Sequence, residues 1–213
     1  MYNKYIKRFI DFILSGIGII VLAIPMLILS VLIFIDDPGP IFFTQKRVGL
    51  HKKNFKLYKF RSMKMSTPHD MPTHLLKNPE QYITKVGGFL RKYSLDELPQ
   101  IFNIFSGRMS IIGPRPALWN QYDLIAERDK YGANDIKPGL TGWAQINGRD
   151  AIEIEDKAKL DGVYAKKLRK GGIVAFSFDM KCFFGTISSV LKHDGVVEGG
   201  TGEMNKNKEK VSE

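Results

Sequence analysis

The feature that most restricts the fold of this chain is an uncharged segment of 24 residues, from Phe12 to Ile35. A helix that spans a membrane needs about 20 such residues. The segment is longer than the apolar core of a signal peptide, which has about 7–15 residues, and Asp36, Asp37 and Pro38 follow it in place of a cleavage site of small residues. The sequence therefore predicts a membrane-embedded helix here.

Both flanks of this segment are basic. Lys4, Lys7 and Arg8 precede it, and seven lysines and arginines follow it within residues 46–61. Positive charge marks the cytoplasmic side of a membrane segment, so a single crossing would place one flank on the unfavourable side. Pro25 lies near the middle, where it removes a backbone hydrogen bond and kinks a helix. We expect a re-entrant helical hairpin that bends at Pro25 and returns to the cytoplasmic face, with a single transmembrane helix as the alternative.

Composition narrows the possible partners. Of 213 residues, 32 are Lys or Arg and 22 are Asp or Glu, which gives a net charge of +10. This surplus favours anionic partners: nucleic acid, phosphorylated small molecules or an anionic membrane surface. Cys182 is the single cysteine, so no intrachain disulfide can form, and we expect it to act as a small apolar residue. The sequence has neither a P-loop lysine motif nor a glycine-rich dinucleotide motif that opens a helix, and its four histidines lack metal-ligand spacing.

Local patterns predict an α+β domain that is mostly helical. Residues 41–45 and 55–60 are β-prone and flank a basic turn, which predicts a short β-hairpin. Residues 64–81 are rich in turn formers and are expected to form a mobile loop over a site. A helix is expected to begin near Ser94.

Two further helices are predicted at about 151–169 and 173–192. The helix at 173–192 has more apolar residues than one narrow face can hold. It could pack in the core, or it could lie as an amphipathic helix in the membrane interface. The expected division of the chain is an anchor at 1–36, a globular domain at 37–195 and a flexible tail at 196–213.

The strongest candidate for chemistry is the segment from Ser94 to Gln100. Ser94 with Glu97 three residues later fits a helix-capping box. The alternative is functional: Asp96 could attack phosphorus as a nucleophile, and Glu97 beside it could help to hold a divalent cation. Pro99 falls where a helix would need a backbone donor, so we expect a local break that helps to aim the two acids.

Basic residues lie close to these acids in the sequence or in rigid turns. Arg91 stands just before the acid pair, and Arg115 stands between two prolines that restrict its backbone and could preorganise it for phosphate. A solvent-facing arginine on a rigid connector is the alternative. Residues 137–143 and 147–149 form a second glycine-rich cluster in which Trp143 could stack on a nucleobase or pack in the core.

The order of these segments along the chain resembles the small monotopic phosphoglycosyl transferases, a family of bacterial sugar transferases. The matching stretches are residues 4–35, 37–43, 45–49, 58–63, 90–91, 94–100, 109–116 and 137–149. Together they reach nearly to residue 195. Residues 193–202 also resemble those of family members that act on acetylated diamino sugars such as diacetylbacillosamine, which suggests an N-acetylated amino sugar as donor and leaves hexoses open.

The resemblance implies a mechanism. Asp96 would attack the β-phosphate of a UDP-sugar and release UMP, and undecaprenyl phosphate would then attack the aspartyl phospho-sugar. Asp96 and Glu97 would hold Mg²⁺. The cations expected to bind substrate phosphates are Arg91, Arg115, Lys59, Arg61, Lys137 and Arg149.

The resemblance also implies a location. The membrane element would be a re-entrant hairpin bent at Pro25, where this chain has Ile24 in the place of the serine common in the family. The catalytic domain, 37–195, would lie on the cytoplasmic face of the bacterial inner membrane as a monotopic protein. The expected partners are the UDP-sugar, undecaprenyl phosphate and membrane lipid, with no nucleic acid; a homodimer is left open.

Two other functions fit parts of the sequence. A phosphatase or phosphotransferase could use Asp96 without a lipid acceptor. A membrane-tethered basic protein could bind anionic lipid or nucleic acid without catalysis, and it would not need an intact acid pair.

Overall fold

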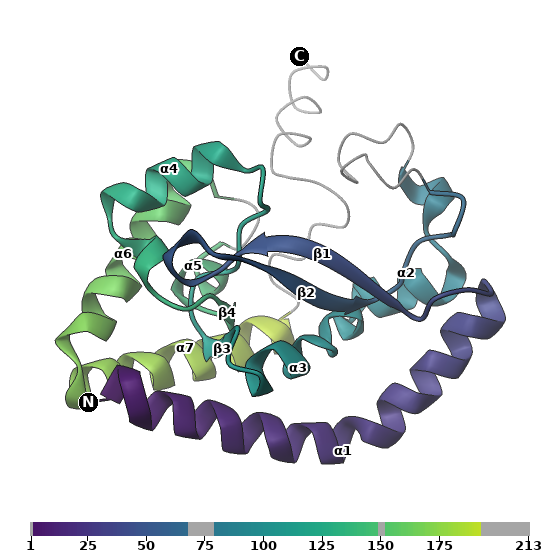
Figure 1. The fold of residues 1–213 in the computed structure, drawn as a ribbon, viewed down its shortest axis with the longest axis horizontal. Helices are drawn as coiled ribbons and strands as arrows, with labels where there is room; N and C mark the ends of the chain where they lie inside the picture. The colour runs from purple at the N-terminus through teal and green to yellow at the C-terminus, as the bar shows by residue number, and fades with distance from the viewer. Residues whose placement is uncertain (1, 68–78, 149–151, 193–213) are drawn as a thin grey trace.

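The computed structural model describes residues 2–67, 79–148 and 152–192 and confirms an α+β architecture that is mostly helical. Two strand pairs are present in these residues: β1 (Phe42–Val48) with β2 (Asn54–Phe60), antiparallel, and β3 (Ser110–Ile112) with β4 (Gly139–Thr141), parallel. The α-helices are α1 (Lys7–Asp36), α2 (Lys85–Lys92), α3 (Gln100–Phe105), α4 (Tyr122–Lys130), α5 (Trp143–Ile146), α6 (Ile154–Lys170) and α7 (Gly172–Lys192). In Figure 1 the β1–β2 ribbon crosses the middle of the molecule, with α1 below it, α4 and α6 at one end and α2 at the other.

The apolar segment forms one continuous helix, α1, which has 30 residues and runs through Pro25. Figure 1 shows α1 curving toward β1 in its second half. Pro25 removes a backbone donor, and the Ser30 hydroxyl donates to the carbonyl oxygen of Met26 at 2.7 Å; both features bend helices. The curved course agrees with a bend near Pro25, and the return of the helix to the same membrane face stays a prediction.

One face of α1 packs against the rest of the chain, and the other is exposed. Gly18 permits the close approach of α3, because a Cβ there would stand 2.5 Å from Cδ1 of Ile101. Met26 and Ile33 join Phe60 in a buried cluster. The exposed face is apolar over its whole length and includes Phe9, Ile13, Ile17, Ile20, Val21, Ile24, Leu27, Ile28, Val31, Phe34 and Ile35. The helix is long and apolar enough to cross a membrane.

The β1–β2 hairpin was predicted from the sequence and is confirmed. Phe42 lies opposite Phe60 and Val48 lies opposite Asn54. The basic turn between the strands places His51 and Lys52 in the left-handed region, with φ values of 52° and 60°. The hairpin matters for the site because β2 carries Lys59.

The second strand pair joins two glycine-rich segments that the sequence analysis treated as separate turns. The Gly113 N–H donates to the carbonyl oxygen of Thr141 at 2.8 Å, and the Gly139 N–H donates to that of Pro114 at 2.8 Å. A Cβ at Gly113 would lie 2.5 Å from the carbonyl oxygen of Lys137, so the two segments approach too closely for a larger residue.

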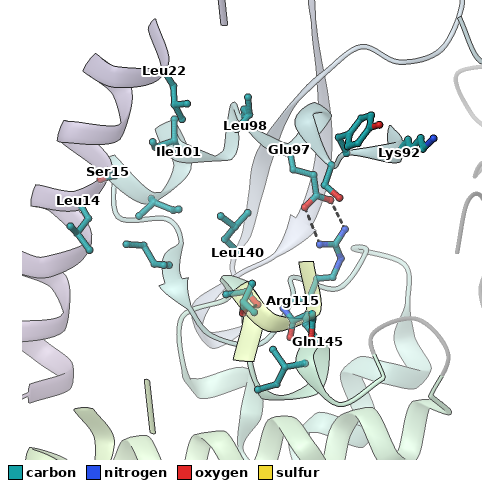
Figure 2. A pocket seen from close by; sticks show the side chains of 18 residues that line it. Leu14, Ser15, Leu22, Lys92, Glu97, Leu98, Ile101, Arg115, Leu140 and Gln145 are labelled. Carbon is teal, nitrogen blue, oxygen red and sulfur yellow. Dashed lines mark hydrogen bonds and ion pairs between the residues drawn. The ribbon is translucent and has the colours of Figure 1, made fainter. Parts of the chain in front are cut away.

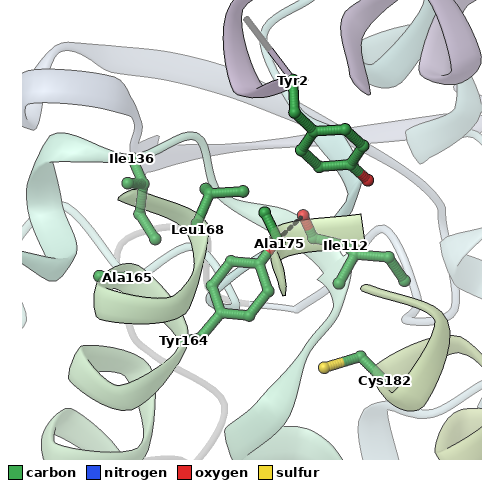
Figure 3. Packing of buried hydrophobic residues seen from close by; sticks show 8 residues of the cluster. All are labelled: Tyr2, Ile112, Ile136, Tyr164, Ala165, Leu168, Ala175 and Cys182. Carbon is green, nitrogen blue, oxygen red and sulfur yellow. Dashed lines mark hydrogen bonds between the residues drawn. The ribbon is translucent and has the colours of Figure 1, made fainter. Parts of the chain in front are cut away.

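Helices α6 and α7 lie close to their predicted positions and form the largest buried cluster with the N-terminal residues. Figure 3 shows its members: Tyr2, Ile112, Ile136, Tyr164, Ala165, Leu168, Ala175 and Cys182. Burial, with Asp179 nearby, raises the pKa of the Cys182 thiol to about 12, which confirms this residue as a buried apolar one. On the outer side of α7, Ile173 is 81% exposed and Phe184 is 64% exposed. Helix α7 therefore has both a core face and an exposed apolar face.

Several predictions fall on residues that the structure does not describe. The greater part of the expected loop, residues 68–78, lies outside the described residues. The same holds for His69, His74, His193, Arg149 and the tail at 196–213.

Candidate active site

The acid pair lies on a single 3₁₀ turn, Leu95–Glu97, just before α3. The prediction of a capping box at Ser94 is wrong. The Ser94 side chain makes no capping hydrogen bond, and its backbone is left-handed, with a φ of 55°. The α-helix begins only after Pro99, so Ser94 stands too far upstream to cap it. The expected break near Pro99 is confirmed: a proline at the N-cap needs no backbone donor, and the acids stay on a tight turn ahead of the helix.

Two cations from distant segments converge on the acids. Nζ of Lys59 lies 3.3 Å from Oδ2 of Asp96 and 2.9 Å from Oε1 of Glu97. Arg115 binds Glu97 with both terminal nitrogens, Nη2 to Oε1 at 2.6 Å and Nη1 to Oε2 at 3.2 Å. The side chains of Asp96 and Glu97 are each only 12% exposed. The fold thus joins β2, the 3₁₀ turn and the loop after β3 into one charged cluster, whose Glu97–Arg115 pair is visible in Figure 2.

The electrostatics of this cluster keep Glu97 ionised. Burial alone would raise the pKa of Glu97, because it penalises the charged form. The charges of Arg115 and Lys59, and their hydrogen bonds, outweigh burial and hold the pKa of Glu97 well below its usual range. Glu97 is therefore a carboxylate at neutral pH and can act as a ligand for cations, not as a proton donor.

The backbone of Arg115 is hydrogen-bonded to a buried ion pair, Arg128 with Asp161, that the sequence analysis missed. Nη2 of Arg128, on α4, donates to the Arg115 carbonyl oxygen at 3.0 Å. The same nitrogen lies 2.5 Å from Oδ2 of Asp161 on α6, and both side chains are at least 95% buried. Together with the flanking prolines, this contact fixes the backbone from which Arg115 reaches Glu97.

The other predicted cations make contacts elsewhere. Arg61 bonds Asp37 just beyond the end of α1, through both the carboxylate and the carbonyl oxygen. Nε of Arg91 donates to the Ser62 hydroxyl at 2.9 Å. Burial lowers the pKa of Lys137, and the positive charges of Arg8 and Lys7 add to this effect. Their roles in phosphate binding stay predictions.

A cavity of about 450 Å³ adjoins Glu97 of the acid pair. Glu97 and Arg115 line one part of it, and Leu14 and Leu22 of α1 line another. Figure 2 shows Glu97, Arg115 and Gln145 on one side of the cavity, facing the side chains of α1 across it. The other apolar lining residues include Leu98, Ile101, Ile104, Ile111, Leu140 and Ile146. The cavity can hold a ligand with a charged end and a long apolar part.

Trp143 packs within the protein. Its ring centroid lies 4.8 Å from that of Phe178, and Nζ of Lys181 lies 4.8 Å from the Trp143 centroid. These contacts favour the core role over nucleobase stacking.

The donor set of the acid pair fits Mg²⁺. Among the described residues no group of three or more His, Cys, Asp or Glu side chains could hold a metal on its own. Mg²⁺ needs only one or two protein carboxylates when phosphate oxygens complete its shell, and Asp96 and Glu97 supply two. Lys59 and Arg115 bind these carboxylates in the structure, so Mg²⁺ would share the carboxylate oxygens with the two cations.

Comparison with known proteins identifies relatives of this chain. The sequence profile described as bacterial sugar transferase matches residues 2–193. The uncharacterized sugar transferase EpsL of Bacillus subtilis is 42% identical over 158 residues, which are 74% of this chain and 73% of that protein. The UDP-glucose:undecaprenyl-phosphate glucose-1-phosphate transferase of Escherichia coli is 36% identical over 87% of this chain and 40% of that protein.

A third relative carries a different sugar name. The UDP-N-acetylgalactosamine-undecaprenyl-phosphate N-acetylgalactosaminephosphotransferase of Aeromonas hydrophila is 35% identical over 88% of this chain and 44% of that protein. The chain thus spans less than half the length of these two named transferases.

Proposed function

This chain belongs to the bacterial sugar transferase family, and we propose that it transfers a sugar 1-phosphate from a UDP-sugar to undecaprenyl phosphate. The observation that carries the proposal is the placement of the acid pair. Glu97, the neighbour of Asp96 on the same 3₁₀ turn, lines a cavity whose opposite wall is the apolar helix α1. A phosphate on a lipid carrier has to meet a water-soluble donor at such a boundary.

The charges of the site suit a pyrophosphate donor. Lys59 and Arg115 provide a compact ammonium and a planar guanidinium within 3.3 Å of the carboxylates. Both groups bind phosphate oxygens well, and in a largely buried site they stabilise charge that develops on a leaving phosphate. Mg²⁺, held by Asp96 and Glu97, would neutralise further charge on the phosphate oxygens.

Asp96 acts as the nucleophile in this proposal. One of its carboxylate oxygens forms a bond to the β-phosphorus of the UDP-sugar, and the bond from that phosphorus to the bridging oxygen breaks, so UMP leaves with the electron pair. A phosphate oxygen of undecaprenyl phosphate then attacks the aspartyl phospho-sugar and restores the Asp96 carboxylate. Ionised Glu97 holds Lys59 and Arg115 in place for both steps.

The contacts of α1 support a monotopic arrangement on the cytoplasmic face. Near its start, Asp11 accepts from the Ile111 N–H at 3.0 Å, and Arg8 donates to the Ile104 carbonyl oxygen at 2.8 Å. At its end, Asp36 accepts from the Val86 N–H at 2.8 Å. Both ends are thus bonded to the same domain, so a straight crossing would pull one end away from its partners. We infer that α1 enters the bilayer with its exposed face and returns to the side on which it started.

The proposal for the donor sugar rests on the names of the relatives and on the sequence near residue 195. The names of the relatives include glucose, galactose and N-acetylgalactosamine, so the family fold accepts several sugars. An N-acetylated amino sugar is our proposal for this chain, and it rests on the resemblance of residues 193–202.

Intact-protein mass spectrometry tests the function. The purified protein in detergent with Mg²⁺ is mixed with a panel of UDP-sugars, first without and then with undecaprenyl phosphate. We expect a phospho-sugar adduct with at least one donor, and release of UMP. Both should be absent in Asp96→Asn and present in the control Asp135→Asn, whose side chain is exposed on the surface.

The outcomes separate the candidate functions. Repeated turnover without the lipid acceptor, with more than one UMP released per protein molecule, would favour a soluble-substrate phosphotransferase. No UMP with any donor, even with undecaprenyl phosphate, would refute the transferase and favour the membrane-tethered binding protein, as would full biological function of Asp96→Asn.

A further inference from the structure

The amide of Gln145 is a polar group of the cavity that has no hydrogen-bond partner among the described residues. Gln145 lies on the short helix α5 and lines the cavity. Its Nε2 and Oε1 atoms are both buried, and residues 2–67, 79–148 and 152–192 provide no hydrogen-bond partner for either. Buried amides are almost always paired in native proteins, so a doubly unpaired amide that lines a cavity needs an explanation. A ligand that occupies the cavity would supply both missing bonds.

Four other polar side chains of the cavity, those of Thr141, Thr186, Ser15 and Glu97, are hydrogen-bonded within the protein. The Thr141 and Thr186 hydroxyls bond one another at 2.7 Å, and the Ser15 hydroxyl donates to the Asp11 carbonyl oxygen at 2.6 Å. Glu97 is held by Arg115 and Lys59. The unpaired state of Gln145 is therefore not shared by these neighbours in the described part of the chain.

Gln145 and Arg115 are carried by two paired segments. The loop with Arg115 follows β3, and α5 follows β4, and these strands pair directly. Gly142, at the start of α5, lies close to the Gln145 amide: a Cβ on Gly142 would stand 3.3 Å from Oε1 of Gln145. Figure 2 shows Gln145 beside Arg115, on the side of the cavity that faces α1. The pairing fixes the amide relative to the phosphate-binding cations.

The chemistry of an amide selects its partner. A glutamine side chain presents an N–H donor and a carbonyl acceptor side by side, so a group with a carbonyl next to an N–H can complete both hydrogen bonds in one plane. A phosphate offers acceptors alone and would leave Oε1 unpaired, and a prenyl chain offers neither. Under the function proposed above, a UDP-sugar carries this group in the uracil ring, and an N-acetylated sugar carries it again in the acetamido group.

We propose that Gln145 recognises an amide edge of the sugar-nucleotide donor, by a pair of hydrogen bonds made beside the transfer site. The inference rests on the proposed function for the identity of the donor. The unpaired amide itself is a feature of the fold and can be tested by binding alone.

Three variants test the proposal. Gln145→Leu removes both hydrogen-bonding atoms, and Gln145→Glu keeps the size and an acceptor but loses the donor. The matched control is Asn147→Leu, just after α5, where an exposed amide bonds the Trp143 carbonyl oxygen at 2.7 Å. UMP release is measured in the presence of undecaprenyl phosphate with UDP-N-acetylglucosamine, UDP-N-acetylgalactosamine, UDP-glucose and UDP-galactose. Binding of UMP is measured by calorimetry.

We expect Gln145→Leu to lower kcat/KM by about 10- to 100-fold, mostly through KM, because a pair of buried hydrogen bonds is lost. The melting temperature should stay equal or rise, because the variant removes an unpaired buried amide. If Gln145 recognises the uracil ring, kcat/KM falls by the same factor for all four donors, and UMP binding weakens by that factor as well. If Gln145 recognises the acetamido group, kcat/KM falls only for the two N-acetylated donors, and UMP binding is unchanged.

Several results would overturn the inference. One is a loss of less than twofold for every donor together with unchanged UMP binding. Another is an equal loss in Asn147→Leu, and a third is a fall in melting temperature that accounts for the loss. If the wild type turns over no donor, the proposed function fails first; equal binding of UMP and of N-acetylglucosamine 1-phosphate to wild type and Gln145→Leu would then refute amide recognition separately.

Discussion

The buried carboxylate of Asp179 provides a direct test of how α1 is fixed to the domain. Asp179 on α7 is 2% exposed. Its Oδ2 accepts from Lys7 Nζ and from the Tyr2 hydroxyl, each at 2.7 Å, and its Oδ1 accepts from the Tyr164 hydroxyl at 2.7 Å. One carboxylate therefore joins the start of α1 to α6 and α7.

Lys7→Met is the informative change. It keeps most of the side-chain volume and removes the one cation within 4 Å of the Asp179 carboxylate among the described ion pairs. Breaking a buried ion pair from one side costs about 3–5 kcal/mol, because the remaining charge is uncompensated. Two tyrosine hydroxyls still donate to Asp179, so we expect about 3 kcal/mol. For a chain of this size about 2–4 °C corresponds to 1 kcal/mol, so the melting temperature should fall by about 6–12 °C.

Tryptophan fluorescence during heating in detergent measures this shift, since Trp119 and Trp143 both lie in the domain. The double variant Lys7→Met with Asp179→Asn removes both charges. Its loss of stability should be smaller than the sum of the losses in the two single variants, which a double-mutant cycle measures. The control Lys52→Met breaks an exposed pair with Asp129 and should shift melting by less than about 2 °C. A shift of that small size in Lys7→Met, or additive effects in the double variant, would refute the reasoning.

Two further predictions concern the acid pair. Arg115→Lys loses the two-pronged contact with Glu97, so we expect UMP release to fall by about 10- to 100-fold with little change in melting temperature; a fall of less than twofold would show that a point charge suffices. The folded state lowers the pKa of Glu97. The ionised Glu97 side chain therefore stabilises the folded protein above the unfolded-state pKa of about 4.3, and this stabilisation is lost as the pH falls through the folded-state pKa. Glu97→Gln should therefore melt lower than wild type by a constant amount from pH 8 to about pH 5, and the difference should shrink in more acidic buffer; a difference that grows on acidification would contradict the assignment.

Local patterns predicted the elements whose formation depends on neighbours in sequence. The hairpin, α6 and α7 follow from alternation, a basic turn and long apolar periodicity, and each is present. The parallel pair β3–β4 could not be foreseen, because each strand has only three residues and the partners are far apart in the chain. The short helices α2, α4 and α5 were also missed, since each has nine residues or fewer and gives little periodic signal in the sequence.

The capping box failed for a different reason. The pattern of Ser94 and Glu97 is correct for a helix start, but it assumes that both side chains are available to the backbone. In the folded protein Glu97 is bonded to Lys59 and Arg115, which come from 38 residues before it and 18 residues after it. Two cations at a buried carboxylate outweigh one capping bond, worth about 1 kcal/mol, so the local rule yields to the site.

The contrast between Lys59 and Arg61 shows what sequence alone could not decide. The two cations are two residues apart, so a continuous strand would direct both to the same face and suggest equal roles at the phosphates. Strand β2 ends at Phe60, and Arg61 instead bonds Asp37, at a place where α1 leaves its apolar segment. Each cation pairs with the carboxylate that the tertiary fold places beside it: the acid pair for Lys59, and Asp37, just beyond the end of α1, for Arg61. Since both side chains are largely buried, neither can exchange partners without breaking an ion pair, and only Lys59 stands within hydrogen-bonding distance of the Asp96 carboxylate that we propose as the nucleophile.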